Sequence, residues 1–362
     1  MAVAQQAPVA KDAEAAASSN MSGLHISAKQ EVVENIAVAA ETMYVEPAAG
    51  AKLAQHLRER LGTGAYDMHA DPAGFAAALT SDLRSVVPDL HLRVAYEPNR
   101  SASTGPMQPR RYSADGASAP RMMARIDGRS NDEIARTNFG FDRVERLEGN
   151  VGYLKLTRLV PPDLSRPTAE AAMAFLAHSD AVIIDVRGVP GGSPELVRLL
   201  LGHFVEKPLR LLTTYDRPSS TTEEIWTAEV TSGRLAGVPL YVLQDRTTAS
   251  AAEMLAYIVQ RRGLGTVVGE TSRGAGNGGN MIEVGSGISF FLPQRRVTDG
   301  PGWEGTGVTP DLLVAAAGAR DAAHRAALDA LRSRRASGQP AAKIGAAEAS
   351  RALRSPASAT AK

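Results

Sequence analysis

The stretch PLYVLQDRTTASAAEMLAYIVQRRGLGTVVGE, residues 239–270, carries most of the information about the fold. A short apolar run over residues 240–243 predicts a buried strand, and a polar turn follows it. Ser250 then opens a predicted helix whose apolar side chains share one face: Met254, Leu255 and Ile258. A hydroxyl at a helix start lies beside N–H groups that have no partner within the helix. A nucleophilic serine needs this setting, because such donors can hold an oxyanion.

A structural alternative exists for the same serine. Ser250 and Glu253 also have the spacing of a capping box, in which each side chain satisfies one end of a helix. Taken alone, this pattern favours a helix cap. Evidence that Ser250 is a catalytic nucleophile must therefore come from the rest of the chain.

Composition excludes several classes of function. The chain has 362 residues with 40 basic and 39 acidic side chains, so its net charge of +1 gives no reason to expect nucleic acid or an anionic membrane as a partner. It contains no cysteine, which excludes disulfides and thiolate metal sites. No apolar run approaches the ~20 residues that an integral membrane segment needs. No cofactor is predicted.

The order of patterns predicts an α/β protein with a small N-terminal helical domain. Alternating strands and helices indicate a mainly parallel sheet. We expect these parts along the chain: a disordered segment at 1–26, a helical domain at 27–90, a connecting strand with a long polar loop at 91–137, an α/β core at 138–318, and a C-terminal helix with a mobile tail at 319–362. The first segment has no visible signal peptide, so a cytoplasmic location and export with the signal removed both stay open.

Two further segments could contribute to a site. In AVIIDVRGVPGGSPELVRLL, residues 181–200, a predicted strand runs into a glycine-rich loop whose N–H groups could receive an oxyanion or a phosphate; an ordinary tight turn is the alternative. In PGWEGTGVTPDLLV, residues 301–314, Glu304 lies on a loop shaped by glycine and proline. Among the histidines, His91 stands out because it lies between Asp89 and a short predicted strand, where the helical domain ends. No pair of histidines has metal-ligand spacing, so no metal site is predicted.

Together these segments resemble the tail-specific (C-terminal-processing) and tricorn-type serine peptidases, most closely the branch related to interphotoreceptor retinoid-binding protein. The resemblance extends over about residues 27–315. Its motifs occur in the family's order: DLHLRV (89–94), NVGYLKL (150–156), VIIDVRGVPGGS (182–193), RTTASAAE (246–253), VVGETSRGAGN (267–277) and WEGTGVTPD (303–311). It implies a ClpP/crotonase-like spiral of ββα units as the core.

The resemblance also implies roles for individual residues. Ser250 matches the nucleophile, and His91 matches the general base of the tricorn-like members. Glu304 is similar to the acidic residue that completes their network. The family's oxyanion hole is formed by backbone N–H groups, and the matching groups here belong to Ala251 and to Gly191 or Gly192.

Three departures from the family pattern matter. Tail-specific peptidases place a catalytic lysine in a Gly-Lys-Gly turn, where this chain has Ala275 between two glycines. Tricorn-type members have a serine just before the histidine, where this chain has Leu90, so Asp89 is an alternative residue for orienting His91. The polar loop is shorter than the ~50 residues of a small domain, so no PDZ domain is expected in it.

The leading hypothesis is a serine peptidase that acts on peptides or proteins without a PDZ domain. The alternative is a non-catalytic binding protein for an apolar ligand such as a retinoid or a fatty acid. A crotonase-like acyl-CoA enzyme is less favoured, because no basic cluster is evident for the nucleotide phosphates. The sequence leaves open the natural substrate and whether the chain forms homo-oligomers.

Overall fold

The computed structural model describes residues 24–97, 129–231 and 233–336, which form two units. The expected disordered N-terminal segment and the C-terminal tail lie largely or wholly outside these residues. Most of the long polar loop also lies outside them, so the expectation that it contains no PDZ domain stays a prediction. Of the helices in the described part of the chain, none is long and apolar enough to cross a membrane.

The first unit combines three helices with strands from two distant parts of the chain. The elements are α2 (Ile26–Met43), α3 (Pro47–Gly62), α4 (Pro72–Val86), β1 (Arg93–Tyr96), β9 (Gly278–Gly285) and the first part of β10 (Ile288–Val297). Asp71 caps α4 by accepting a hydrogen bond from the Gly74 N–H at 2.7 Å, and Pro72 occupies the first helical position.

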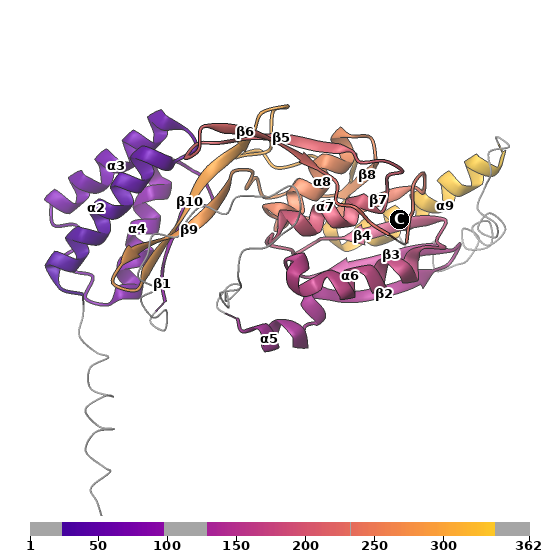
Figure 1. Ribbon diagram of the computed structural model, residues 1–362, viewed down its shortest axis with the longest axis horizontal. Helices are drawn as coiled ribbons and strands as arrows, with labels where there is room; N and C mark the ends of the chain where they lie inside the picture. The colour runs from indigo at the N-terminus through magenta and orange to yellow at the C-terminus, as the bar shows by residue number, and fades with distance from the viewer. Residues whose placement is uncertain (1–23, 98–128, 232, 337–362) are drawn as a thin grey trace, which may run out of the picture. The chain divides into compact units, whose positions relative to one another are not determined.

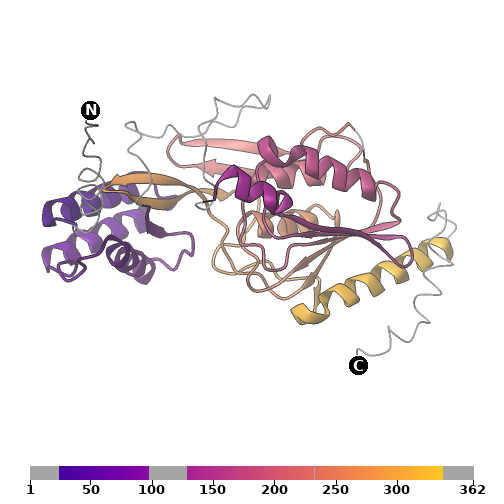
Figure 2. The ribbon, with the colours of Figure 1, turned by 90° about the horizontal axis from the view of Figure 1, so that it is seen from below.

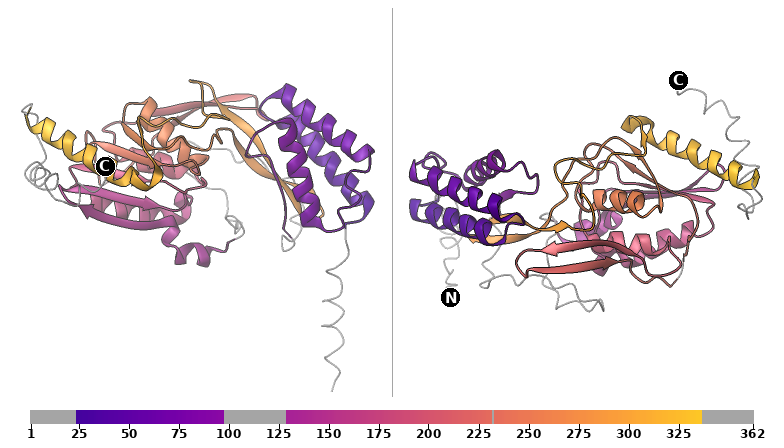
Figure 3. Two further views of the ribbon diagram at one scale, coloured as in Figure 1. Left: turned by 180° about the vertical axis from the view of Figure 1, so that it is seen from behind. Right: turned by 90° about the horizontal axis from the view of Figure 1, so that it is seen from above.

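Residues 280–293 belong to this helical unit rather than to the α/β core expected at 138–318. The reason is their apolar side chains. Val284, Phe290 and Leu292 are buried in one cluster with Ile36 and Leu79 of the helices. Figure 3 shows the orange β9–β10 hairpin running along the indigo helices.

The second unit is an α/β domain built on a six-stranded sheet of order β11-β8-β7-β4-β3-β2 (Figure 1). All neighbouring strands are parallel except the β2–β3 pair. The strands of this sheet are β2 (Phe141–Leu147), β3 (Val151–Leu156), β4 (Ala181–Asp185), β7 (Leu240–Gln244), β8 (Gly265–Gly269) and β11 (Leu312–Leu313). The α/β class expected from the alternating pattern is therefore confirmed.

Helices cover both faces of this sheet, as Figure 2 shows for α9 on the face opposite α6. The remaining elements of the unit are α5 (Asn131–Arg136), η2 (Asn138–Gly140), α6 (Pro162–Leu176), α7 (Pro194–Gly202), β5 (Arg210–Asp216), β6 (Thr221–Trp226), α8 (Ala251–Arg261), η3 (Ala316–Gly318) and α9 (Ala319–Ala336). The strands β5 and β6 pair with each other, and β5 also pairs with the last part of β10.

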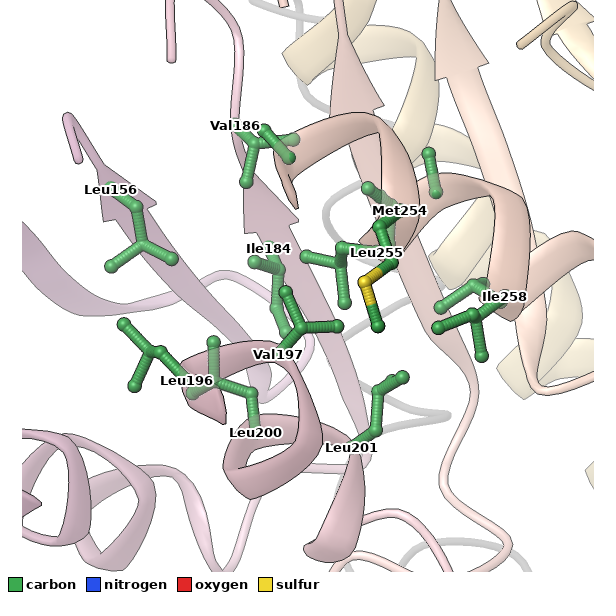
Figure 4. Close-up of a cluster of buried hydrophobic side chains, with 14 of the residues drawn as sticks. Leu156, Ile184, Val186, Leu196, Val197, Leu200, Leu201, Met254, Leu255 and Ile258 are labelled. Carbon is green, nitrogen blue, oxygen red and sulfur yellow. The ribbon is translucent and has the colours of Figure 1, made fainter. Parts of the chain in front are cut away.

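Alternation along the strands divides the core into two layers. Val182 and Ile184 of β4 pack with α6, α7 and α8, whereas Ala181 and Ile183 pack with the Ala-rich face of α9. Figure 4 shows side chains of α7 and α8 meeting beside β4, including Val197 and Leu255. A continuous apolar run such as residues 181–184 is thereby explained, because both of its faces are covered.

Candidate active site

The carboxyl ends of three parallel strands place the predicted site loops at one edge of the sheet. The register pairs Asp185, the last residue of β4, with Leu243 of β7, and Gln244 of β7 with Gly269 of β8. The loops that leave these ends span residues 186–193, 245–250 and 270–277. Crevices at the carboxyl ends of parallel strands are the usual place for ligands in such folds.

Ser250 occupies a strained turn between β7 and α8. Its backbone angles are φ 55° and ψ −123°, which a residue with a Cβ rarely adopts. Strain of this kind costs about 1–3 kcal/mol and concentrates at functional sites. The turn is fixed to the neighbouring loop, because Thr248 Oγ1 donates to Val186 O at 3.0 Å and the Ala249 N–H donates to Val189 O at 3.0 Å. The strand–turn–helix geometry predicted for this serine is present.

The glycine-rich loop after β4 lies directly against Ser250. A Cβ placed on Gly191 would lie 2.8 Å from Ser250 Cβ and 3.3 Å from its Oγ, and φ is +118° at this glycine. A Cβ on Gly192 would lie 2.1 Å from Leu159 O. Only glycine allows this close approach. Ala251 is the first residue of α8, so its N–H has no acceptor within the helix.

A second group of predicted residues also lies together in this unit. Single ligand atoms from Asp89, His91 and Glu304 all lie within 4.8 Å of one another. His91 Nδ1 is 4.0 Å from Asp89 Oδ1, and the same oxygen accepts the His91 backbone N–H at 2.9 Å. Asp89 is 2% exposed, so its carboxylate acts on the imidazole with little solvent between them. Both residues considered for orienting His91 are therefore beside it.

Glu304 is held by backbone donors in a mostly buried position. Its Oε2 accepts the N–H groups of Gly276 and Asn277, each at 2.7 Å. Burial and the nearby charge of Asp89 raise the pKa of Glu304 to about 7, although these two hydrogen bonds act in the opposite direction. The carboxyl group thus changes its charge near neutral pH.

The segment Ser272–Asn277, which follows β8, connects the two groups. Its Gly274 and Ala275 N–H groups donate to the Glu253 carboxylate, which also accepts the Ser250 N–H at 2.8 Å. Its other end holds Glu304, and Asn277 Nδ2 donates to Asp89 Oδ2 at 3.3 Å. Ser250 with the glycine loop, and His91 with its carboxylates, are thus attached to the same short segment.

Three residues of this network were not among the predicted site residues: Glu253 beyond its cap role, Ser272 and Asn277. Ser272 and Asn277 follow a parallel strand at the same sheet edge as Ser250, and this position was the signal that could have identified them.

The cluster of Asp89, His91 and Glu304 also has the donor types of a metal site. An imidazole between two carboxylates equally fits a general base with its orienting groups. The expectation that the chain has no metal site stays a prediction.

Comparisons with known proteins show which proteins the chain resembles. Residues 150–314 match the model of peptidase family S41. The carboxy-terminal processing protease CtpB of Bacillus subtilis is 29% identical over 182 residues, which are 48% of this chain and 36% of that protein. The carboxy-terminal-processing protease of Bartonella bacilliformis is 25% identical over 178 residues, 47% of this chain and 40% of that protein. The chain thus covers less than half the length of either relative.

Two solved structures are similar over most of the chain. A lipoprotein from Streptococcus agalactiae superposes with a TM-score of 0.54 at 12% identity, covering 84% of this chain and 97% of its own. The photosystem II D1 C-terminal processing protease gives a TM-score of 0.49 at 15% identity, covering 80% and 93%. The first similarity supports the fold alone. The narrower relationship to retinoid-binding proteins stays a prediction. Residues 150–314 match peptidase family S41, and the predicted resemblance to the tail-specific serine peptidases is confirmed.

Proposed function

We propose that this protein is a serine peptidase that hydrolyses peptide bonds with Ser250 as its nucleophile. The observation that carries the proposal is the strained backbone of Ser250 at the start of α8, packed against Gly191. A helix cap alone needs no such strain. A nucleophile does, because a sharp strand-to-helix turn presents its hydroxyl at the sheet edge.

In the proposed reaction, His91 accepts the proton of the Ser250 hydroxyl as its oxygen attacks the substrate carbonyl carbon. The imidazole thereby becomes positively charged. The carboxylates of Asp89 and Glu304 lie within reach of His91 and stabilise this charge. Since Ala275 stands where tail-specific peptidases have their lysine, the imidazole takes the role of base.

The tetrahedral intermediate carries an oxyanion that backbone N–H groups receive. We assign these donors to Ala251, the first residue of α8, and to Gly191 or Gly192, of which Gly191 lies against Ser250. One such donor contributes about 3 kcal/mol to lowering the barrier. His91 then gives its proton to the leaving amine, and the acyl-enzyme forms. A water molecule attacks the acyl carbon, with His91 again as the base, and releases the acid product and free Ser250.

The proposed substrates are peptides or proteins, as for the carboxy-terminal processing proteases that the chain resembles. The alternative, a binding protein for an apolar ligand, stays open as a prediction, and no observation in the described residues favours it. The same experiment separates the two.

The test is hydrolysis of fluorescein-labelled casein by the full chain and by its Ser250→Ala and His91→Ala variants. The proposal predicts turnover that Ser250→Ala abolishes and that His91→Ala lowers by at least about 100-fold. Retinol titrated against tryptophan emission runs in parallel. Saturable quenching without any casein turnover would overturn the peptidase in favour of the binding protein.

A further inference from the structure

Glu253 is a fully buried carboxylate with more partners than a helix cap requires. It is 0% exposed. Its Oε1 accepts the Ser272 hydroxyl and the Gly274 N–H, each at 2.6 Å, and its Oε2 accepts the N–H groups of Ser250 and Ala275, each at 2.8 Å. A capping box accounts for the bond to Ser250 alone. The other three partners come from the segment after β8.

One of these partners extends the network to the loop that carries Glu304. The Ser272 hydroxyl accepts the Val308 N–H at 2.7 Å while it donates to Glu253. The two segments are also joined directly, because the Gly305 N–H donates to Gly274 O at 2.9 Å. Glu253 therefore connects the Ser250 turn with both segments that hold Glu304.

We propose that Glu253 is a positioning residue, which holds the strained Ser250 turn in register with the two segments that hold Glu304 beside His91. This inference rests on the proposed peptidase function. Glu253 touches no reacting atom, so its effect passes through the Ser250 backbone. Four donors around two oxygens call for a carboxylate, because each oxygen must accept two hydrogen bonds.

Glu253→Gln tests the proposal at nearly constant size. Its amide NH2 would face two donors in place of an acceptor, whichever way the amide is turned. The resulting displacement of the turn is expected to slow labelling by a fluorophosphonate. We expect the maximal labelling rate to fall about 100-fold, the loss typical of a misplacement of 1 Å. The probe concentration for half-maximal rate should change less than about threefold, since the groups that contact the probe are retained.

Leu255→Ala is the matched control for a purely structural effect. Leu255 lies on the same helix, is 0% exposed and packs in the apolar core, and its side chain has no group that could hydrogen-bond to the network. This variant should have a lower midpoint of urea unfolding, yet label within about threefold of the wild-type rate when folded. Labelling of folded Glu253→Gln at the wild-type rate, or a loss no larger than that of Leu255→Ala, would overturn the proposal.

Ser272→Ala keeps the proposal testable if Glu253→Gln does not fold. It removes one of the four donors and leaves the carboxylate in place. The maximal labelling rate should fall about tenfold, between the wild type and Glu253→Gln; an unchanged rate would count against the network. Wild-type protein that takes up no label would instead refute the peptidase itself, so the two failures are distinguishable.

Discussion

Glu304→Gln should make the protein more stable at alkaline pH. The folded protein raises the pKa of Glu304 from 4.5 to about 7, through burial and the nearby Asp89 charge. Between these values the folded state binds more protons than the unfolded state. The free energy of unfolding therefore falls as the pH rises through this window. Glutamine cannot ionise, and its amide oxygen can still accept the N–H groups of Gly276 and Asn277.

The size of the effect follows from the pKa. At about 1.4 kcal/mol for each tenfold change in proton affinity, the rise corresponds to about 3 kcal/mol as an upper value. We therefore expect Glu304→Gln to exceed the wild type in unfolding free energy by about 2–3 kcal/mol at pH 8. At pH 4.5 the carboxyl group is mostly protonated in the folded protein, and the difference should fall below about 1 kcal/mol.

Urea unfolding at pH 4.5, 6 and 8 measures this difference, followed by circular dichroism and by the emission of Trp226 and Trp303. Glu206→Gln is the control, because Glu206 is exposed and its substitution should leave the stability unchanged at every pH. A Glu304→Gln protein that is less stable than the wild type at pH 8, or a difference that does not vary with pH, would refute the reasoning. Glu304→Gln should also lose peptidase activity, since it removes one of the two carboxyl groups beside His91.

Three other substitutions have defined outcomes. Ser250→Gly should exceed Ser250→Ala in stability by about 1 kcal/mol, because only glycine adopts the local backbone angles without strain; equal urea midpoints would contradict this. Gly191→Ala should abolish fluorophosphonate labelling, because its Cβ would lie 2.8 Å from Ser250 Cβ; labelling at the wild-type rate would exclude the close approach. Asp185→Asn should lower the unfolding free energy by about 3–5 kcal/mol, since it deprives Arg187 and Lys155 of their buried carboxylate. Urea unfolding measures this loss, and one below about 1 kcal/mol would show that the cluster contributes little.

The strand–turn–helix unit at Ser250 is predictable from sequence because its signals are local. The apolar strand, the polar turn and the apolar helix face are all within 32 residues, 239–270. The backbone strain at Ser250 is not predictable in this way. It depends on hydrogen bonds from the turn to Val186 and Val189, which the chain reaches only after folding.

Long-range pairings limit what the sequence alone predicts. The strand β9 begins with two glycines and lies on the helical unit, so no local pattern marks its place. The edge strand β6, with the sequence TTEEIW, is polar and mostly exposed, and it escapes a search for apolar runs. The grouping of His91 with Glu304 joins residues far apart in the chain, and only the family resemblance pointed to it.

Mass-spectrometric mapping of the residue that a fluorophosphonate modifies tests the central claim most directly. We predict one adduct, on the peptide that contains Ser250, formed by the wild type and absent from Ser250→Ala. An adduct on another residue, equal labelling of Ser250→Ala, or no adduct on folded wild-type protein would contradict it.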